Sequence, residues 1–179
     1  MSLLLRLATG IDGLSRRFGQ LAAWTVLLSA LISAGNAFVR YGVDWSSNAL
    51  LEIQWYLFAW MVMLGAPYVL LVNEHVRVDL FYGKLRGRQP VWVDIFGLLA
   101  FLLPVMGYLA WLSFPYFLQT WRSGEMSQSI GGLIRWPATL AMPLGFAVLW
   151  LQGLAELIKR VAYLQGRYEM DTHYEKPLQ

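Results

Sequence analysis

The residue with the clearest potential for chemistry is Glu52, an acid at the start of a long apolar run. From Ile53 to Val72 the sequence has no charge, and Gln54 is the only strongly polar side chain. An ionisable group beside or inside a membrane is costly and is usually paired or functional. Arg40 is the nearest basic residue before it. Three interpretations remain open: an ion pair with Arg40, a contact with a partner subunit, or a step in proton transfer.

A second polar group follows directly after this apolar run. His75, Arg77 and Asp79 alternate with valines in the stretch NEHVRVD. We expect them to fix the end of the preceding helix by hydrogen bonds, within the chain or to a partner. The other histidine, His173, lies in the polar C-terminal stretch. Haem ligation in a membrane anchor needs histidines that face each other on spans, so we expect no haem or metal site.

The patterns of several other sites are also missing. The sequence contains no cysteine, which removes disulfides and thiolate chemistry. No serine–histidine pair falls within an apolar run, and no glycine-rich phosphate loop is present, since Gly131 and Gly132 predict only a turn. We therefore expect neither an enzyme nor a cofactor, and no nucleic acid partner.

The apolar residues are concentrated in four blocks. Hydrophobic residues make up 58% of the 179 residues and charged residues 14%, against about 45–50% and about 25% in soluble domains. A helix needs roughly 20 apolar residues to cross a bilayer. The sequence therefore predicts an all-α integral membrane protein, with one domain over residues 1–179 and a tail at 159–179. The predicted transmembrane helices are residues 18–39, 49–72, 91–116 and 136–158.

Residue types near the ends of these spans add detail. Trp136 precedes Pro137, and proline suits the first turn of a helix. Trp55 and other tryptophans near span ends favour the boundary between lipid and water. Glu156 and Arg160 are four residues apart, which predicts an ion pair on the fourth helix. Asp94, near the start of the third span, can reach the basic segment before it.

Two segments outside the spans have the periodicity of short amphipathic helices in the membrane surface. In residues 1–19 one helical face collects Leu3, Leu7, Ile11, Leu14 and Phe18. After the second span a similar face collects Val78, Phe81, Tyr82 and Leu85. We therefore expect short interfacial helices before the first span and after the second.

Basic residues are distributed unequally between the two sides of the predicted bundle. Of the 14 Lys and Arg residues, eleven fall in the N-terminal segment, the 73–90 segment and the tail. The other side holds only Arg40, Arg122 and Arg135. Because cytoplasmic segments carry the excess of Lys and Arg, we expect both termini and the 73–90 segment to be cytoplasmic.

Several stretches together resemble the small membrane subunit of the TRAP transporters, the tripartite ATP-independent periplasmic solute importers. These are Asn36 with Arg40, Glu52 with Gln54-Trp55-Tyr56-Leu57-Phe58, His75-Val76-Arg77-Val78-Asp79, and the run of Gly124-Glu125, Ser127, Gly131-Gly132-Leu133 and Trp136-Pro137. The resemblance covers the whole chain, with four spans and both ends inside. Within this family, the chain is similar to the branch that is often labelled for mannitol or chloroaromatic compounds.

The resemblance implies partners, a role and a location. Small subunits of this family bind a large multi-span subunit that carries solute and sodium, while a periplasmic solute-binding protein delivers an organic acid or related solute. The chain would lie in the lipid of the bacterial inner membrane and act as a scaffold. The candidates for structural or partner contacts are Asn36, Arg40, Glu52, Gln54, Trp55, His75, Arg77, Asp79, Gly131, Gly132 and Trp136.

Two other classes are alternatives. A self-contained four-span exporter needs an acid deep in its first span, where this chain has none. A membrane anchor of a redox enzyme needs the paired histidines that this chain lacks. Because the polar side chains gather at the span ends, we also expect no solute site within this chain.

The predicted topology can be tested with single cysteines, because the chain has none of its own. In intact cells, Ser46→Cys and Ser127→Cys should react with a membrane-impermeant maleimide, whereas Gly83→Cys and Thr172→Cys should not. Labelling in the reverse pattern would contradict the orientation.

Overall fold

The chain folds into helices throughout the part that the structure describes. The computed structural model describes residues 3–45, 47–74 and 87–169. Within them, an isolated bridge between Met126 and Ile134 is the nearest feature to a sheet. Four helical rods are long and apolar enough to cross a membrane: Leu3–Val43, Asn48–Leu71, Gln89–Ser123 and Trp136–Leu164. The predicted all-α membrane fold with four spanning helices is confirmed.

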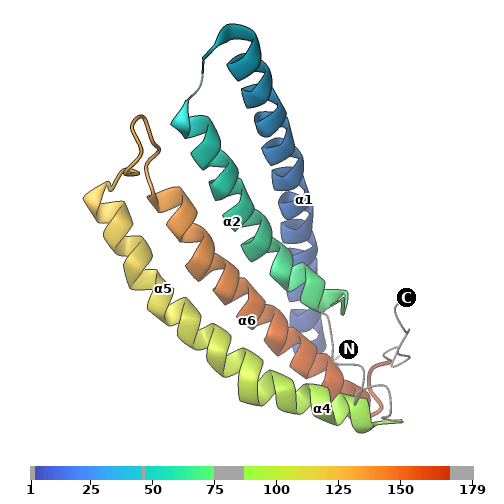
Figure 1. Cartoon of the computed structure of the whole chain (residues 1–179). Helices are drawn as coiled ribbons and strands as arrows, with labels where there is room; N and C mark the ends of the chain where they lie inside the picture. The colour runs from blue at the N-terminus through green and yellow to red at the C-terminus, as the bar shows by residue number, and fades with distance from the viewer. Residues whose placement is uncertain (1–2, 46, 75–86, 170–179) are drawn as a thin grey trace.

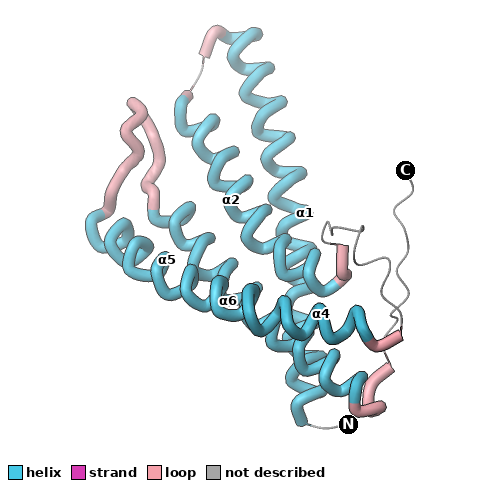
Figure 2. Tube along the Cα trace, turned by 60° about the horizontal axis from the view of Figure 1, so that its bottom comes forward, coloured by secondary structure: helices cyan, strands magenta, loops and turns pink. Residues whose placement is uncertain are grey.

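The helix α6 (Trp136–Leu164) is the central element (Figures 1 and 2). It packs against α1 (Leu3–Val43), α2 (Asn48–Leu71) and α5 (Leu103–Ser123). In the most apolar 18-residue stretch of α6, 44% of the residues are buried. In the equivalent stretches of the other three helical rods, 6–11% are buried. Small residues permit this close packing. A Cβ atom on Gly145 would lie 2.9 Å from the backbone oxygen of Met63 on α2.

The first helix differs from its prediction. The structure has one continuous helix, α1, where the sequence predicted a surface helix over 1–19 followed by a span over 18–39. At about 1.5 Å per residue its 41 residues reach about 60 Å, roughly twice the hydrocarbon thickness. The predicted apolar stripe is turned outward, because Leu3 and Leu7 are exposed while Leu5, Ala8 and Ser15 are buried.

The continuity of α1 has a local and a tertiary cause. A Cβ atom on Gly10 or Gly13 would meet no neighbouring atom. Each glycine lowers the helix propensity of α1, but neither breaks the helix. No proline interrupts residues 3–43. The face that carries Asp12 and Ser15 binds α6. These contacts hold the N-terminal turns in line with the span.

The third rod is continuous but locally widened. It begins as α4 (Gln89–Gly97), passes through a π-helical segment, Leu98–Leu102, and continues as α5. Pro104 follows this segment and has no N–H to donate, so the regular bonding pattern cannot continue through it. The Leu103 N–H instead bonds the carbonyl of Leu98, five residues back. The rod ends at Ser123, beyond the predicted boundary at residue 116.

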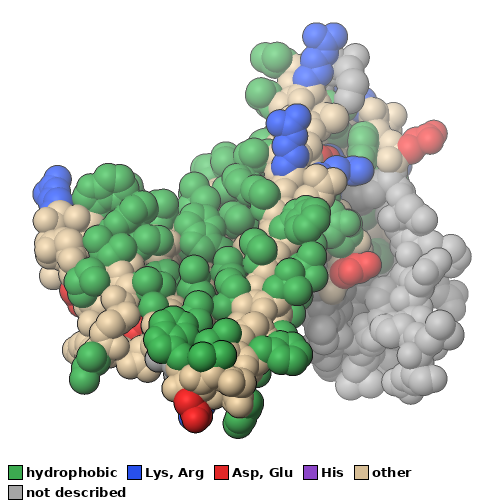
Figure 3. All heavy atoms as spheres, turned by 90° about the horizontal axis from the view of Figure 1, so that it is seen from above, with side chains coloured by type: hydrophobic (Ala, Val, Ile, Leu, Met, Phe, Trp, Pro, Cys, Tyr) green, Lys and Arg blue, Asp and Glu red, His purple; other side chains and the backbone are tan. Residues whose placement is uncertain are grey.

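The bundle has two distinct ends. The N-terminal end holds the starts of α1 and α4 and the ends of α2 and α6, and the hairpin end holds residues 124–135 and the turn from α1 to α2 (Figure 1). The helix α6 continues to Leu164, so Lys159 and Arg160 belong to it and not to a tail. Hydrophobic side chains cover much of the face of the described helices that is seen from above (Figure 3). Among the most exposed are Trp24, Phe38, Trp55 and Trp111.

Candidate functional site

At the hairpin end, Glu52 holds the 124–135 segment against α2. One carboxylate oxygen accepts a hydrogen bond from the Ser127 hydroxyl, and the other accepts one from the backbone N–H of Leu133 at 2.8 Å. The predicted pair with Arg40 is wrong, because Arg40 is exposed and forms no ion pair among the described residues. Glu52 therefore connects α2 to the α5–α6 connection and not to α1.

The 124–135 segment is a hairpin with its own bonds. The Ser127 N–H donates to the Leu133 carbonyl at 2.9 Å, and the Arg135 N–H donates to the Glu125 carbonyl at 3.0 Å. Gly131 turns the chain at a φ of 73°, a left-handed conformation that favours glycine. A Cβ atom on its neighbour Gly132 would lie 2.9 Å from the Glu52 Oε1 atom. Gly131 thus permits the turn, and Gly132 leaves room for the Glu52 carboxylate.

Two further hydrogen bonds fix the hairpin to α2, and a ring contact joins α5 to α6 at its base. The Asn48 amide donates to the Ile130 carbonyl at 3.0 Å, and the Tyr56 hydroxyl donates to the Ile134 carbonyl at 3.2 Å. At the base, Trp136 packs on Trp121 with ring centroids 4.8 Å apart. The result is a fixed loop whose tip residue, Ile130, has 93% of its surface exposed.

An ion pair at the base of the hairpin is more exposed. Arg135 pairs with Glu125, and its guanidinium also donates to the Tyr116 hydroxyl at 3.4 Å. The bond to Glu125 raises the pKa of Arg135 further above its usual value, so this side chain is charged at any physiological pH. More than a third of each side chain of this pair is exposed, so its contribution to stability is small.

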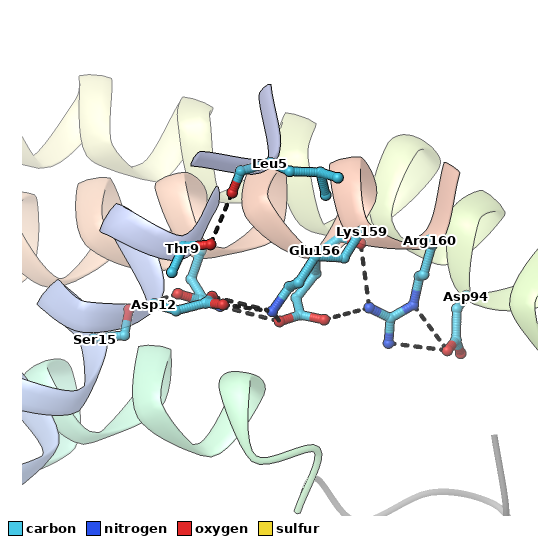
Figure 4. A network of polar contacts seen from close by, with 9 residues as sticks. Leu5, Thr9, Asp12, Ser15, Asp94, Glu156, Lys159 and Arg160 are labelled. Atoms are coloured by element: carbon cyan, nitrogen blue, oxygen red, sulfur yellow. Dashed lines mark hydrogen bonds and ion pairs between the residues drawn. The ribbon is translucent and has the colours of Figure 1, made fainter. Parts of the chain in front are cut away.

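A buried ion-pair network joins three helices at the N-terminal end (Figure 4). Lys159 on α6 lies 3.0 Å from Asp12 on α1 and also pairs with Glu156. Arg160 pairs with Glu156 and lies 3.0 Å from Asp94 on α4. The predicted pair of Glu156 with Arg160 is confirmed. Asp94 was expected to reach the basic segment before α4, and its partner among the described residues is Arg160.

Two neutral side chains complete this network. The Gln152 amide donates to Asp12 at 2.9 Å and to Glu156 at 3.1 Å, and its oxygen accepts a hydrogen bond from the Ser15 hydroxyl at 2.7 Å. Gln152 and Ser15 are fully buried. Every buried charge here thus has at least one partner, which is the condition under which buried ions are tolerated.

Sequence reasoning identified only part of this network. Asp12, Ser15, Gln152 and Lys159 were not among the candidates. A signal was present, because polar residues at positions 152, 156, 159 and 160 share one face of a helix. Nothing in the sequence placed Asp12 and Ser15 opposite that face.

The remaining candidates are dispersed over the structure. Asn36 on α1 is buried, and its Oδ1 atom has no hydrogen-bond partner. Gln54 donates to the Leu50 carbonyl of its own helix, and Trp55 has 78% of its surface exposed. The cluster of His75, Arg77 and Asp79 lies outside the described residues. Within the described part of the chain, no group of three or more His, Cys, Asp or Glu side chains could hold a metal ion.

Comparison with known families assigns this architecture. The family model described as "Tripartite ATP-independent periplasmic transporters, DctQ component" matches residues 29–162, well over half of the chain. The chain belongs to the DctQ family. No curated protein and no solved structure matches it.

Membership of the DctQ family sets the class of this chain. It is the small membrane component of a TRAP transporter, which agrees with its four spanning helices. The family consists of transporter components and not of enzymes. The matched residues include Glu52, the hairpin and most of α6. The N-terminal turns of α1 that carry Asp12 and Ser15 lie outside the match.

The role of Glu52 can be tested by hydrogen exchange. Glu52→Ala should raise the exchange rate of the Leu133 amide about tenfold or more, because a hydrogen bond to a charged group contributes about 1.5–3 kcal/mol. Glu125→Ala is the matched control at the exposed ion pair and should change that rate little. Equal effects of the two substitutions would show that Glu52 does not hold the hairpin.

The network at the N-terminal end should contribute strongly to stability. Lys159→Met removes the cation shared by the buried carboxylate of Glu156 and the half-buried carboxylate of Asp12. Breaking a buried pair costs about 3–5 kcal/mol. The thermal unfolding temperature in detergent micelles should fall markedly. Arg17→Met, at an exposed residue of α1, should leave it nearly unchanged. Adding Asp12→Asn to Lys159→Met should recover part of the loss, and no recovery would argue against the pairing.

Proposed function

We propose that this chain is the static scaffold subunit of a TRAP importer. In this proposal it supports a large multi-span membrane subunit that carries an organic acid or related solute together with sodium. A soluble periplasmic protein captures the solute and delivers it. The proposal deepens the family assignment, which by itself gives only a small transporter component.

The observation that carries the proposal is the separation of polar and apolar surfaces. The buried ion pairs occupy the N-terminal end, and the Glu52 contacts occupy the hairpin end. Between the ends, α1, α2 and the α4–α5 rod expose large apolar side chains over most of their length. Such surfaces suit lipid and a helical partner. A solute carrier would instead need convergent polar groups near the bilayer midplane.

The two fixed ends also support a scaffold. Buried charges at one end join α1, α4 and α6, and the hairpin at the other end joins α2, α5 and α6. An element that moves during transport would be expected to have few such interhelical bonds. In the proposed orientation the N-terminal end is cytoplasmic and the hairpin faces the periplasm, where the solute-binding protein acts.

The test is an uptake assay with the three components expressed in chosen combinations. Cells that keep the large subunit and the binding protein but lack this chain should lose most solute uptake. Replacing the chain with a homologue that still assembles should restore uptake and leave the order of competing solutes unchanged. Full uptake without the chain would contradict the scaffold role, and an altered competition order would show that the chain helps form the solute site.

A further inference from the structure

Three exposed arginines lie on the N-terminal turns of α1. Arg6, Arg16 and Arg17 form no ion pair with any described residue. The only acidic residue of α1, Asp12, faces α6 and pairs with Lys159 (Figure 4). These turns therefore present positive charge that the described part of the chain does not neutralise.

The position of Arg17 along α1 places it at the level of the lipid headgroups. The stretch of α1 between Arg17 and Arg40 contains no charged residue. At about 1.5 Å per residue it spans about 35 Å, which is close to the roughly 30 Å of the hydrocarbon layer. The two arginines therefore mark the two boundaries of the span, and Arg16 and Arg17 lie among the headgroups at the N-terminal end.

An apolar row runs from Arg17 into the span. Its members follow Arg17 at spacings of four, three, four and three residues, and therefore lie on one face of α1: Leu21, Trp24, Leu28 and Leu31. Each has 46–62% of its surface exposed. An exposed apolar row that begins at a basic side chain matches the two parts of a phospholipid, an anionic headgroup and an acyl chain.

The two glycines of these turns leave space beside Arg17. A Cβ atom on Gly10 or Gly13 would meet no neighbouring atom, so the helix backbone is open there. Gly13 precedes Arg17 by about one turn, and helical side chains point back toward the N-terminus of their helix. The Arg17 side chain is therefore directed over bare backbone, where a phosphate group meets no competing side chain.

We propose that this face of α1 binds an anionic phospholipid, with the phosphate at Arg16 and Arg17 and an acyl chain along the row from Leu21 to Leu31. A guanidinium group donates two parallel hydrogen bonds to a phosphate. Basic side chains beside a membrane also attract anionic lipids. Arg6 lies on the same face as Arg17, three turns nearer the N-terminus, and adds to the positive charge.

A lipid fits this face better than a helix of a partner protein does. A partner helix would have to bring carboxylates to the arginines, and ionisable groups at membrane depth are costly. The lipid carries its phosphate at the required level without that cost. The basic part of the face lies before residue 29, outside the family match, so the proposal goes beyond the family assignment and the proposed function.

Lipid titration followed by native mass spectrometry tests the proposal on the full chain in a neutral detergent. Replacing both Arg16 and Arg17 with Gln should weaken binding of dioleoylphosphatidylglycerol at least about fivefold. The weaker binding of dioleoylphosphatidylcholine should stay the same. The matched control replaces two exposed arginines at the hairpin end, Arg40→Gln with Arg122→Gln, and should change neither affinity.

Other outcomes of the titration overturn the proposal. These are equal affinity for the two lipids, phosphatidylglycerol binding that survives the double substitution, and an equal loss of binding in the control. Glycerol 3-phosphate carries the charge without acyl chains, so it should not displace the lipid. Displacement would show that a free phosphate suffices and that the apolar row is not part of the site.

The apolar row has a separate test in cell membranes. A photoreactive phenylalanine at Leu21 should crosslink to phospholipid, and intact-protein mass spectrometry should show phosphatidylglycerol enriched among the adducts relative to the membrane. Arg16→Gln with Arg17→Gln should remove that enrichment. Adducts with the large subunit or with a second copy of this chain would show that protein covers this face. Lipid adducts without enrichment would show that the arginines select no lipid.

Discussion

Polar side chains in a membrane-spanning bundle cannot rely on water, and this constraint organises the whole molecule. Each buried charge that the structure describes is paired with another, and most buried polar atoms have a protein partner. The charges are therefore gathered where several helices meet. At the N-terminal end of the bundle the helices that meet are α1, α4 and α6. Their packing depends on the ion pairs of Lys159 and Arg160 with carboxylates on neighbouring helices.

The central position of α6 follows from the same constraint. Its small residues allow α2 and α5 to approach closely, and its Gln152, Lys159 and Arg160 bond side chains on α1 and α4. Apolar packing between helices gains little in lipid, because lipid tails are as apolar as the side chains. The close backbone contacts and the ion pairs therefore supply much of the specificity that selects this arrangement.

Among the described residues, Asn36 on α1 is the place where this constraint is not met. Its buried side-chain oxygen has no donor, in contrast to the paired network of Asp12 and Ser15 near the start of α1. The contacts at the two ends, by contrast, join neighbouring helices and hold the bundle together.

The amino-acid sequence alone determined the fold class, the approximate spans and the family. Helix length and apolar composition decide the fold class and the spans locally, since a bilayer requires a minimum apolar length and internal backbone bonding. The pair of Glu156 and Arg160 was also predictable, because residues four apart on a helix are neighbours. The turn at Gly131 and Gly132 was predictable from residue type.

Only the tertiary structure decided which partners these side chains meet. Glu52 lies close to Arg40 in sequence, yet its partners are Ser127 and Leu133, 75 and 81 residues away. Asp12 was placed on a surface helix, yet it binds Lys159, 147 residues away. Such pairs depend on the rotation of each helix about its axis and on which helices pack together. The local sequence leaves both open, because several faces of these apolar helices can be buried, and close packing around α6 selects one of them.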